Sequence, residues 1–128
     1  MRYLLDTNVI IEAVGGCPPA VAALKEAVQS EWVGYSAITR LELFGYPDLK
    51  PEEERALQTV IGELAEVAVT ASIVDRAIRL RKIGRIKVPD AIIAATAQEM
   101  QAVLVTRNEE DFKMIGAIQL LNPFTTNR

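Results

Sequence analysis

The feature that most constrains the fold is a strand-like segment at Ala102–Thr106, which begins with the unbroken apolar run Ala-Val-Leu-Val. Such runs are typical of parallel sheets, whose strands are buried on both faces. Further strands are predicted at Arg2–Asp6, Trp32–Tyr35, Glu66–Thr70 and Ala117–Leu121, with helical segments between them. This alternation predicts an α/β fold, a three-layer α/β/α sandwich around a central, mostly parallel sheet of four to five strands.

The segments between the strands carry helix signals. Thr7 and Asn8 are expected to cap the first helix, and Ser36 the third. Pro51 suits the first position of a helix. The predicted helices are Val9–Val14, Ala20–Ser30, a segment from Ser36 to Gly45, one that begins at Pro51, Ala71–Ile83, Pro89–Met100 and Glu109–Ile115. We expect residues 1–128 to form a single domain, since this length supports a substantial core.

Composition excludes several kinds of chemistry. The chain has no histidine, which removes Ser-His-Asp and Cys-His catalysis and histidine-ligated zinc. Its single cysteine, Cys17, excludes an intramolecular disulfide and a multi-cysteine zinc site. No apolar run is long enough to span a bilayer, and Asp6 interrupts the apolar N-terminus too early for a signal peptide. We therefore expect a cytoplasmic location.

Three acidic residues occupy positions where an isolated carboxylate is costly. Asp6 ends an apolar strand, Glu42 shares a helix face with Ile38 and Leu41, and Asp90 lies in the first turn of an alanine-rich helix. A buried charge needs a partner or a metal ion. Carboxylate oxygens suit Mg2+ or Mn2+, and such ions in small α/β domains indicate phosphoryl chemistry. Alternatively, Asp6 caps a helix, Asp90 opposes a helix dipole and Glu42 pairs with an arginine such as Arg40.

Four segments, taken together, resemble the PIN domain, the ribonuclease fold of VapC-type toxins from toxin–antitoxin pairs. They are Leu4–Ile10 (LLDTNVI), Tyr35–Leu43 (YSAITRLEL), Val88–Ala97 (VPDAIIAATA) and Leu104–Asn108 (LVTRN). The resemblance covers essentially the whole chain. It implies a metal-dependent endoribonuclease that hydrolyses RNA and leaves a 5′-phosphate and a 3′-hydroxyl.

The resemblance also implies roles for individual residues. Asp6, Glu42 and Asp90 match the acids that bind Mg2+ or Mn2+. Asn108 stands where the family often has a fourth acid, so the choice between one metal and two stays open. The expected catalytic set is Asp6, Glu42, Asp90 and Asn108, and the residues expected to orient these acids and their waters are Thr7, Asn8, Ser36, Thr106 and Asp111.

A net charge of −3 is unusual for a nucleic-acid-binding protein, but basic residues are concentrated just before Asp90. We expect this cluster to contact RNA phosphates, together with one basic residue next to Asn108. The alternative is a solvated helix end whose basic groups oppose the dipole. The expected RNA-binding residues are Arg81, Lys82, Arg85, Lys87 and Arg107.

The resemblance further implies two protein partners, a cognate antitoxin and a second copy of the chain in a homodimer. Apolar helix residues such as Val9, Ile10, Val14, Leu43 and Phe44 could supply such surfaces, although core packing is the favoured interpretation for most of them. Two other functions stay open at this point. One is a PIN-like domain that binds RNA or protein without catalysis. The other is an aspartyl-phosphate enzyme, which the absence of a second acid beside Asp6 disfavours.

Overall fold

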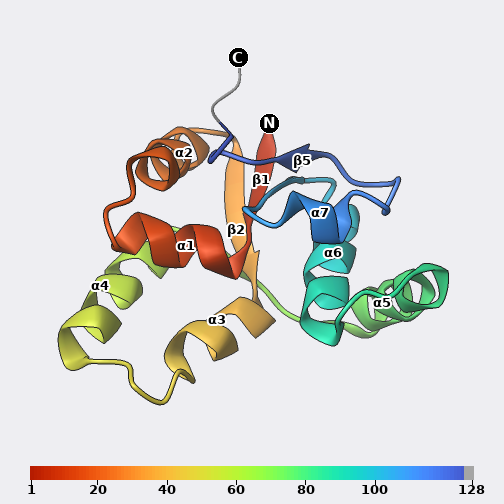
Figure 1. Ribbon diagram of the computed structural model, residues 1–128, viewed down its shortest axis with the longest axis horizontal. Helices are drawn as coiled ribbons and strands as arrows, with labels where there is room; N and C mark the ends of the chain where they lie inside the picture. The colour runs from red at the N-terminus through yellow and green to blue at the C-terminus, as the bar shows by residue number, and fades with distance from the viewer. Residues whose placement is uncertain (126–128) are drawn as a thin grey trace.

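The computed structural model describes residues 1–125 as a five-stranded parallel sheet with helices on both faces (Figure 1). The strands lie side by side in the order β3-β2-β1-β4-β5. Their bounds are β1 Arg2–Leu5, β2 Trp32–Ser36, β3 Ala65–Val67, β4 Val103–Val105 and β5 Leu120–Leu121. The predicted α/β/α sandwich is confirmed, with five strands and every pairing parallel.

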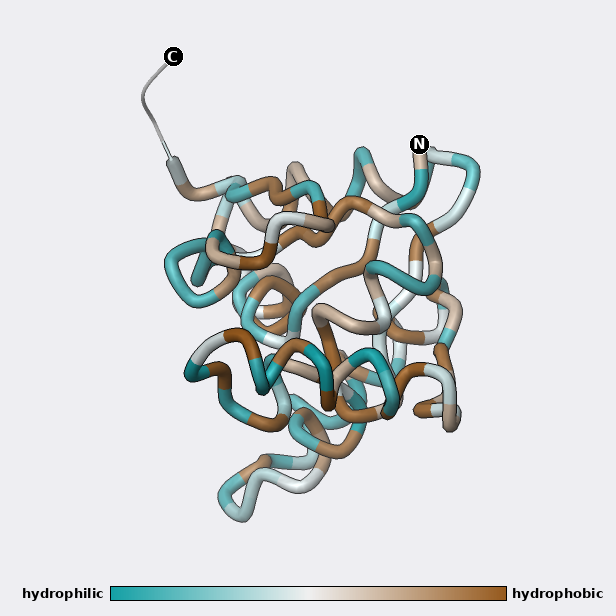
Figure 2. Tube along the Cα trace, turned by 90° about the vertical axis from the view of Figure 1, so that its right-hand side faces the viewer, coloured by the Kyte–Doolittle hydropathy of each residue, from teal (hydrophilic) through white to brown (hydrophobic). Residues whose placement is uncertain are grey.

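Two helical layers cover the sheet, and each has its own apolar core. In Figure 1, α1, α2 and α4 lie on one side of the sheet, and α5, α6 and α7 lie on the other. Hydrophilic and hydrophobic residues alternate along the helices that face the viewer in Figure 2, as expected for helices with one buried face. The helices are α1 Thr7–Val14, α2 Pro18–Val28, α3 Ala37–Phe44, α4 Pro51–Ile61, α5 Ala71–Ile83, α6 Val88–Met100 and α7 Glu109–Phe112.

The order of the strands reverses at β1. From β1 the chain builds outward through β2 to β3, and it then returns to the other side of β1 to add β4 and β5. Leu5 pairs with Val105, so the carboxyl ends of β1 and β4 lie next to each other. In open α/β sheets, ligands bind outside the carboxyl ends of the strands at such a reversal. The topology therefore points to the residues that follow Leu5 and Val105.

Several helix ends differ from the sequence predictions. The cap of α1 is Asp6, whose carboxylate accepts a hydrogen bond from the Thr7 backbone N–H, so the prediction of Thr7 and Asn8 as caps was wrong. Pro18 and Pro19 begin α2, whereas we expected them to lie in the break before it. Proline fits there because the first helical N–H groups have no intrahelical partner. The predicted cap at Ser36 is confirmed, since its hydroxyl accepts from the Ile38 N–H.

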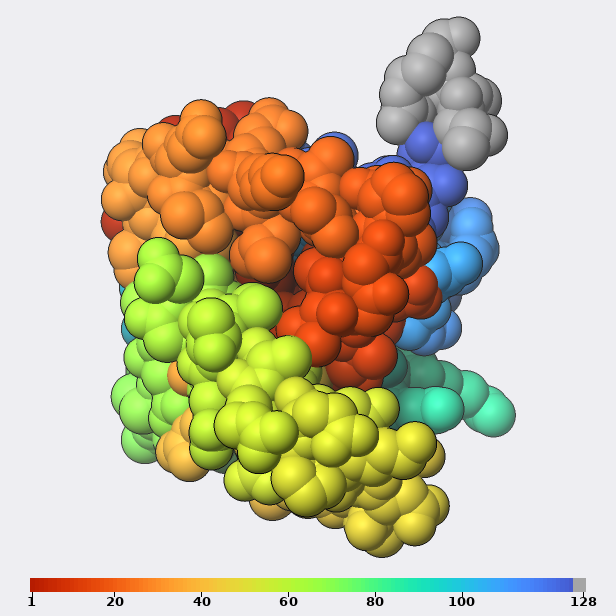
Figure 3. All heavy atoms as spheres, turned by 90° about the vertical axis from the view of Figure 1, so that its left-hand side faces the viewer, coloured from red at the N-terminus to blue at the C-terminus, as the bar shows by residue number. Residues whose placement is uncertain are grey.

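Helices α1 and α2 pack against each other and, with α4, form the outer surface seen in Figure 3. Most of the apolar residues that we considered for partner surfaces belong to the core: Val9, Ile10 and Leu43 are buried, and Val14 and Phe44 pack beside them. Within residues 1–125, no single helix is long and apolar enough to cross a membrane. The helices α1 and α2 reach that length only as a pair, which is bent by 111° at their break.

Gly34 allows a close approach at the centre of the sheet. A Cβ atom at this position would lie 2.5 Å from the Trp32 ring and 2.6 Å from the Ala65 carbonyl oxygen. We predict that Gly34→Ala lowers the free energy of unfolding by about 1–3 kcal/mol, because the strand must shift to accommodate the methyl group. Urea denaturation measures the change. Gly84→Ala is the control, since a Cβ there meets nothing within 4 Å; equal effects of the two variants would contradict the prediction.

Candidate metal centre

Asp6 lies at the reversal of strand order and is 4% exposed. Its backbone N–H donates to the Val105 carbonyl, which continues the pairing of β1 with β4. One carboxylate oxygen accepts from the Thr7 N–H at 2.8 Å and the other from the Thr106 hydroxyl at 2.7 Å. Burial raises the pKa of Asp6, and these two hydrogen bonds oppose that effect. The carboxylate is therefore fixed in position by the start of α1 and by the residue that follows β4.

Glu42 lies on α3 and reaches the same region from its exposed side. Its carboxylate accepts a hydrogen bond from the Thr7 hydroxyl at 2.6 Å, which ties α3 to the start of α1. The prediction that Glu42 shares a buried helix face with Leu41 was wrong. Glu42 is exposed, Leu41 is 67% exposed, and Leu43 is the buried residue of this turn. The alternative of a salt bridge with Arg40 also fails, because Arg40 pairs with Glu66.

Asp90 lies in the first turn of α6, where Pro89 helps to begin the helix. Its side chain is half-buried, and its pKa is raised to about 6. Burial is the main cause, and the charges of Asp6, Asp111 and Glu42 add to it, whereas Lys87 opposes them. Carboxylates from four separate segments thus lie within electrostatic reach of one another.

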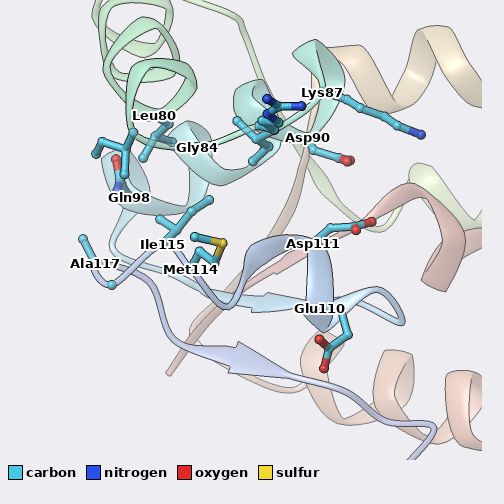
Figure 4. A pocket seen from close by; sticks show the side chains of 14 residues that line it. Leu80, Gly84, Lys87, Asp90, Gln98, Glu110, Asp111, Met114, Ile115 and Ala117 are labelled. Atoms are coloured by element: carbon cyan, nitrogen blue, oxygen red, sulfur yellow. The ribbon is translucent and has the colours of Figure 1, made fainter.

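Asp111 approaches this group more directly than its position in the sequence suggested. It lies on α7, and Figure 4 shows its side chain and that of Asp90 extending in the same direction from their two helices. Its charge raises the pKa of both Asp6 and Asp90. Asn108, the expected fourth position, precedes α7, and its backbone N–H donates to the Thr106 hydroxyl. The signal for Asp111 in the sequence is its spacing, one helical turn beyond Asn108.

The chemistry of the donors fits a divalent cation. Closely spaced carboxylates with a raised pKa lack enough positive charge nearby, and Mg2+ and Mn2+ prefer oxygen ligands. As the side chains stand within residues 1–125, no three acidic or cysteine side chains form an arrangement that could hold an ion. The Glu42 carboxylate, for instance, is held toward the start of α1 by the Thr7 hydroxyl. The acids are thus gathered around one region without forming a chelating triad.

The surrounding polar residues hold the acids in different ways. Thr106 donates to Asp6 and accepts from the Asn108 N–H, so it is fixed at both ends. The Asn8 carboxamide lies 3.5 Å from the Asp6 carboxylate and accepts from the backbone N–H of Arg107. Ser36 caps α3, and its hydroxyl therefore bonds to backbone there. Thr7, Asn8 and Thr106 contact the acids directly.

The expected RNA-binding residues divide into two groups. Arg81 donates to the Ile86 carbonyl and so holds the connection between α5 and α6, and Arg107 pairs with Glu12 and lies over the Phe124 ring. These two arginines are engaged within the protein. The remaining three are exposed, and the described part of the chain offers them no ion pair: Lys82, Arg85 and Lys87.

Fold and site together define an α/β domain with an acidic centre at the carboxyl end of a parallel sheet. The PIN domain family model matches residues 3–117. The chain therefore belongs to the PIN domain family, which confirms the resemblance seen in the sequence. The comparison with curated proteins finds no significant match.

Several solved structures with the same fold come from toxin–antitoxin systems. A toxin–antitoxin complex from Klebsiella pneumoniae is similar with 30% identity and a TM-score of 0.82, over 97% of this chain and 99% of that chain. VapBC2 from Rickettsia felis, bound to a promoter DNA fragment, shows 26% identity and a TM-score of 0.83, over 95% and 98% of the two chains. VapBC-1 from Haemophilus influenzae shows 27% identity and a TM-score of 0.79, over 98% and 100%. These likenesses support a VapC-type toxin.

The raised pKa of Asp90 gives a test in the metal-free protein. A carboxyl group whose pKa is higher when folded holds its proton more tightly in the folded state, so its contribution to stability falls as the pH rises between 3.8 and about 6. We predict that Asp90→Asn is more stable than wild type by about 1–2 kcal/mol at about pH 8 in EDTA, a value reduced for solvent screening of this half-exposed group. The difference shrinks at about pH 4, where folded wild-type Asp90 is already protonated.

Urea denaturation across this pH range provides the measurement. Asp75→Asn is the matched control, because Asp75 is exposed on α5 and outside the acidic group. An Asp90→Asn variant that gains no stability at high pH would show that the surrounding charges do not strain this site.

Proposed function

We propose that the chain is a Mg2+- or Mn2+-dependent endoribonuclease and the toxin of a VapBC-type pair. One observation carries the proposal: Asp6, Glu42, Asp90 and Asp111, from four separate segments, are close enough for the charges of the other three to raise the pKa of Asp90. Such a concentration of negative charge destabilises the free protein, and a bound cation would relieve it. Family membership supports phosphodiester hydrolysis as the reaction.

The residues that would hold the cation are Asp6 and Asp90, with Glu42 and Asp111 beside them. A bound cation would lower the pKa of a water molecule and neutralise charge on the scissile phosphate. The chain's own contribution is positioning: Thr106 and the Thr7 N–H fix the Asp6 carboxylate, and the Thr7 hydroxyl fixes that of Glu42. Asn108 remains in the proposed catalytic set as a neutral group next to Thr106.

The nuclease assay uses a mixed set of labelled RNAs with Mn2+ or Mg2+. We predict that wild type cleaves RNA, that EDTA stops cleavage, and that Asp6→Asn or Asp90→Asn lowers the rate by at least about 100-fold, because each removes a charged ligand. Asp111→Asn is expected to lower the rate as well, and Asp75→Asn serves as the control with wild-type activity.

The outcomes separate the proposed nuclease from the alternatives. Cleavage that survives both Asp6→Asn and Asp90→Asn would rule out this centre. A folded wild type that binds RNA but cuts none of the set, with either metal, would favour the non-catalytic PIN-like domain instead. Stabilisation of wild type by Mn2+ in thermal unfolding, lost in Asp6→Asn, would show binding of the ion independently of cleavage.

For RNA contact, we propose Lys82, Arg85 and Lys87 as the residues that meet phosphates near the cleavage site. We predict that the double substitution Arg85→Gln and Lys87→Gln weakens binding of a labelled single-stranded RNA in EDTA. It should also reduce the slope of log affinity against log salt by roughly 0.7 for each lost phosphate contact. Lys25→Gln is the control, because the Lys25 side chain is exposed on α2. Unchanged binding at low salt would contradict the assignment.

The partners follow from the same relatives. Because several similar structures are complexes of a toxin with its antitoxin, we propose that a cognate antitoxin binds this chain and inhibits it. Homodimer formation stays a prediction of the family resemblance. Size-exclusion chromatography with light scattering, with the chain alone and with the antitoxin, tests both.

A further inference from the structure

A cavity of about 320 Å³ lies directly beside the acidic centre, in the range of small-ligand sites. It opens between the α5–α6 connection and the segment that follows α7. Asp90 and Asp111 form one of its sides, and Figure 4 shows Leu80 and Gln98 at the opposite side. The cavity and the proposed cleavage site therefore share two carboxylates.

The lining of the cavity is mainly apolar. Leu80 and Ile86 are buried in the core and form part of its wall, and Ile115 packs against the same core. Two further wall residues, Ile83 and Met114, are 73% and 76% exposed. Large apolar side chains left this open next to a cavity indicate a surface that receives a ligand with flat or apolar faces.

Polar groups are few and are placed at the ends of the cavity. The half-buried Gln98 supplies a carboxamide that can both donate and accept hydrogen bonds. Arg85 and Lys87 line the side near Asp90 and are exposed. The cavity thus combines an apolar wall, one amide and two cationic groups with the carboxylates of Asp90, Asp111 and the exposed Glu110, which pairs with Lys113.

We propose that this cavity binds a nucleobase of the RNA strand, the base of a nucleotide next to the scissile phosphate; the inference rests on the proposed function. A phosphate bound near Asp90 and Asp111 would place its own nucleoside beside these two residues. Single-stranded bases are recognised by packing of their faces and by hydrogen bonds to their edges. Leu80 and Met114 supply the apolar surface for the face of the base, and Gln98 supplies hydrogen bonds for its edge.

An apolar side chain of a protein partner is the competing occupant. Such a side chain would pack against the apolar wall but would leave the Gln98 amide and the cationic groups of Arg85 and Lys87 without a partner. A nucleotide uses all three features, because its base matches the amide and its phosphates match the cations. Charge and hydrogen bonding therefore favour the base.

The test uses uncharged nucleosides and the metal-free protein, so that neither catalysis nor a bound ion is needed. The protein carries 13C-labelled methionine methyl groups, and the Met114 signal reports on the cavity. The Met100 signal is the internal control, because Met100 packs against the core. Adenosine, guanosine, cytidine and uridine are titrated in EDTA, with ribose as the matched probe without a base. We expect at least one nucleoside to shift Met114 with millimolar affinity, while ribose leaves it unchanged.

Two glycines in the lining are sites where a larger side chain can be introduced to narrow the cavity. A Cβ atom at Gly84 or Gly116 meets nothing within 4 Å. Gly84→Leu and Gly116→Leu are each expected to weaken nucleoside binding at least about tenfold, with the Met100 signal confirming the fold. Gly15→Leu is the control, since a Cβ there meets backbone oxygens only at ordinary contact distances of 3.5 and 3.6 Å.

Three results would overturn the inference. The Met114 signal could shift equally with ribose, or it could shift with no nucleoside. Alternatively, both leucine variants could bind nucleosides as tightly as wild type does. A Met114 shift with N-acetyl-leucine amide but with no nucleoside would assign the cavity to a protein side chain. Because the experiment contains no metal, its failure leaves the cleavage assay untouched. If the chain binds a nucleoside but cuts no RNA, the proposal of a base-binding cavity stands and only the proposed nuclease activity is ruled out.

Discussion

The hydrogen bond between the Thr106 hydroxyl and the Asp6 carboxylate joins the residues that follow β1 and β4 at the carboxyl end of the sheet. Asp6 follows β1 and Thr106 follows β4, the two strands between which the order of the sheet reverses. Thr106 also receives the Asn108 N–H, so the loop leading to α7 takes its position from the same hydroxyl. The placement of Asp111 on α7 thus depends on a contact that begins at Asp6. The buried carboxylate of Asp6 therefore has three roles. It caps α1, it bonds to the residue that follows β4, and it belongs to the acidic centre.

The acidic centre costs the folded protein stability. Burial and mutual repulsion raise the pKa of Asp6 and Asp90, so ionisation of either group in place raises the free energy of the folded protein. Destabilising clusters of charge of this kind occur in natural proteins where a bound ligand offsets the repulsion. Such residues are then retained for function and not for stability. The hydroxyls of Thr7 and Thr106 reduce the cost without removing the charges, which leaves the carboxylates able to attract a cation.

Local patterns in the sequence predicted the fold well, because strand burial and helix starts are short-range properties. The helix Ala71–Ile83 was predicted with its observed bounds, and the positions of Asp6 and Asp90 followed from a strand end and from Pro89. Glu42 was chosen for a wrong reason, since periodicity shows that a helix has an apolar face but not which turn of it packs. The closeness of Asp111 to Asp90 depends on how α7 lies beside α6, a tertiary arrangement that residue spacing alone does not give.

The central place of β1 has a consequence for synthesis of the chain. Tyr3 pairs with Val33 on one side and with Val103 on the other, so the second edge of β1 is covered only after β4 has been synthesised. Closing so long a loop is entropically costly and slow. An unfinished chain lacks Thr106 and Asp111 and cannot assemble the acidic centre. Any activity that depends on this centre therefore begins only after Asp111 has been synthesised and α7 has packed beside α6.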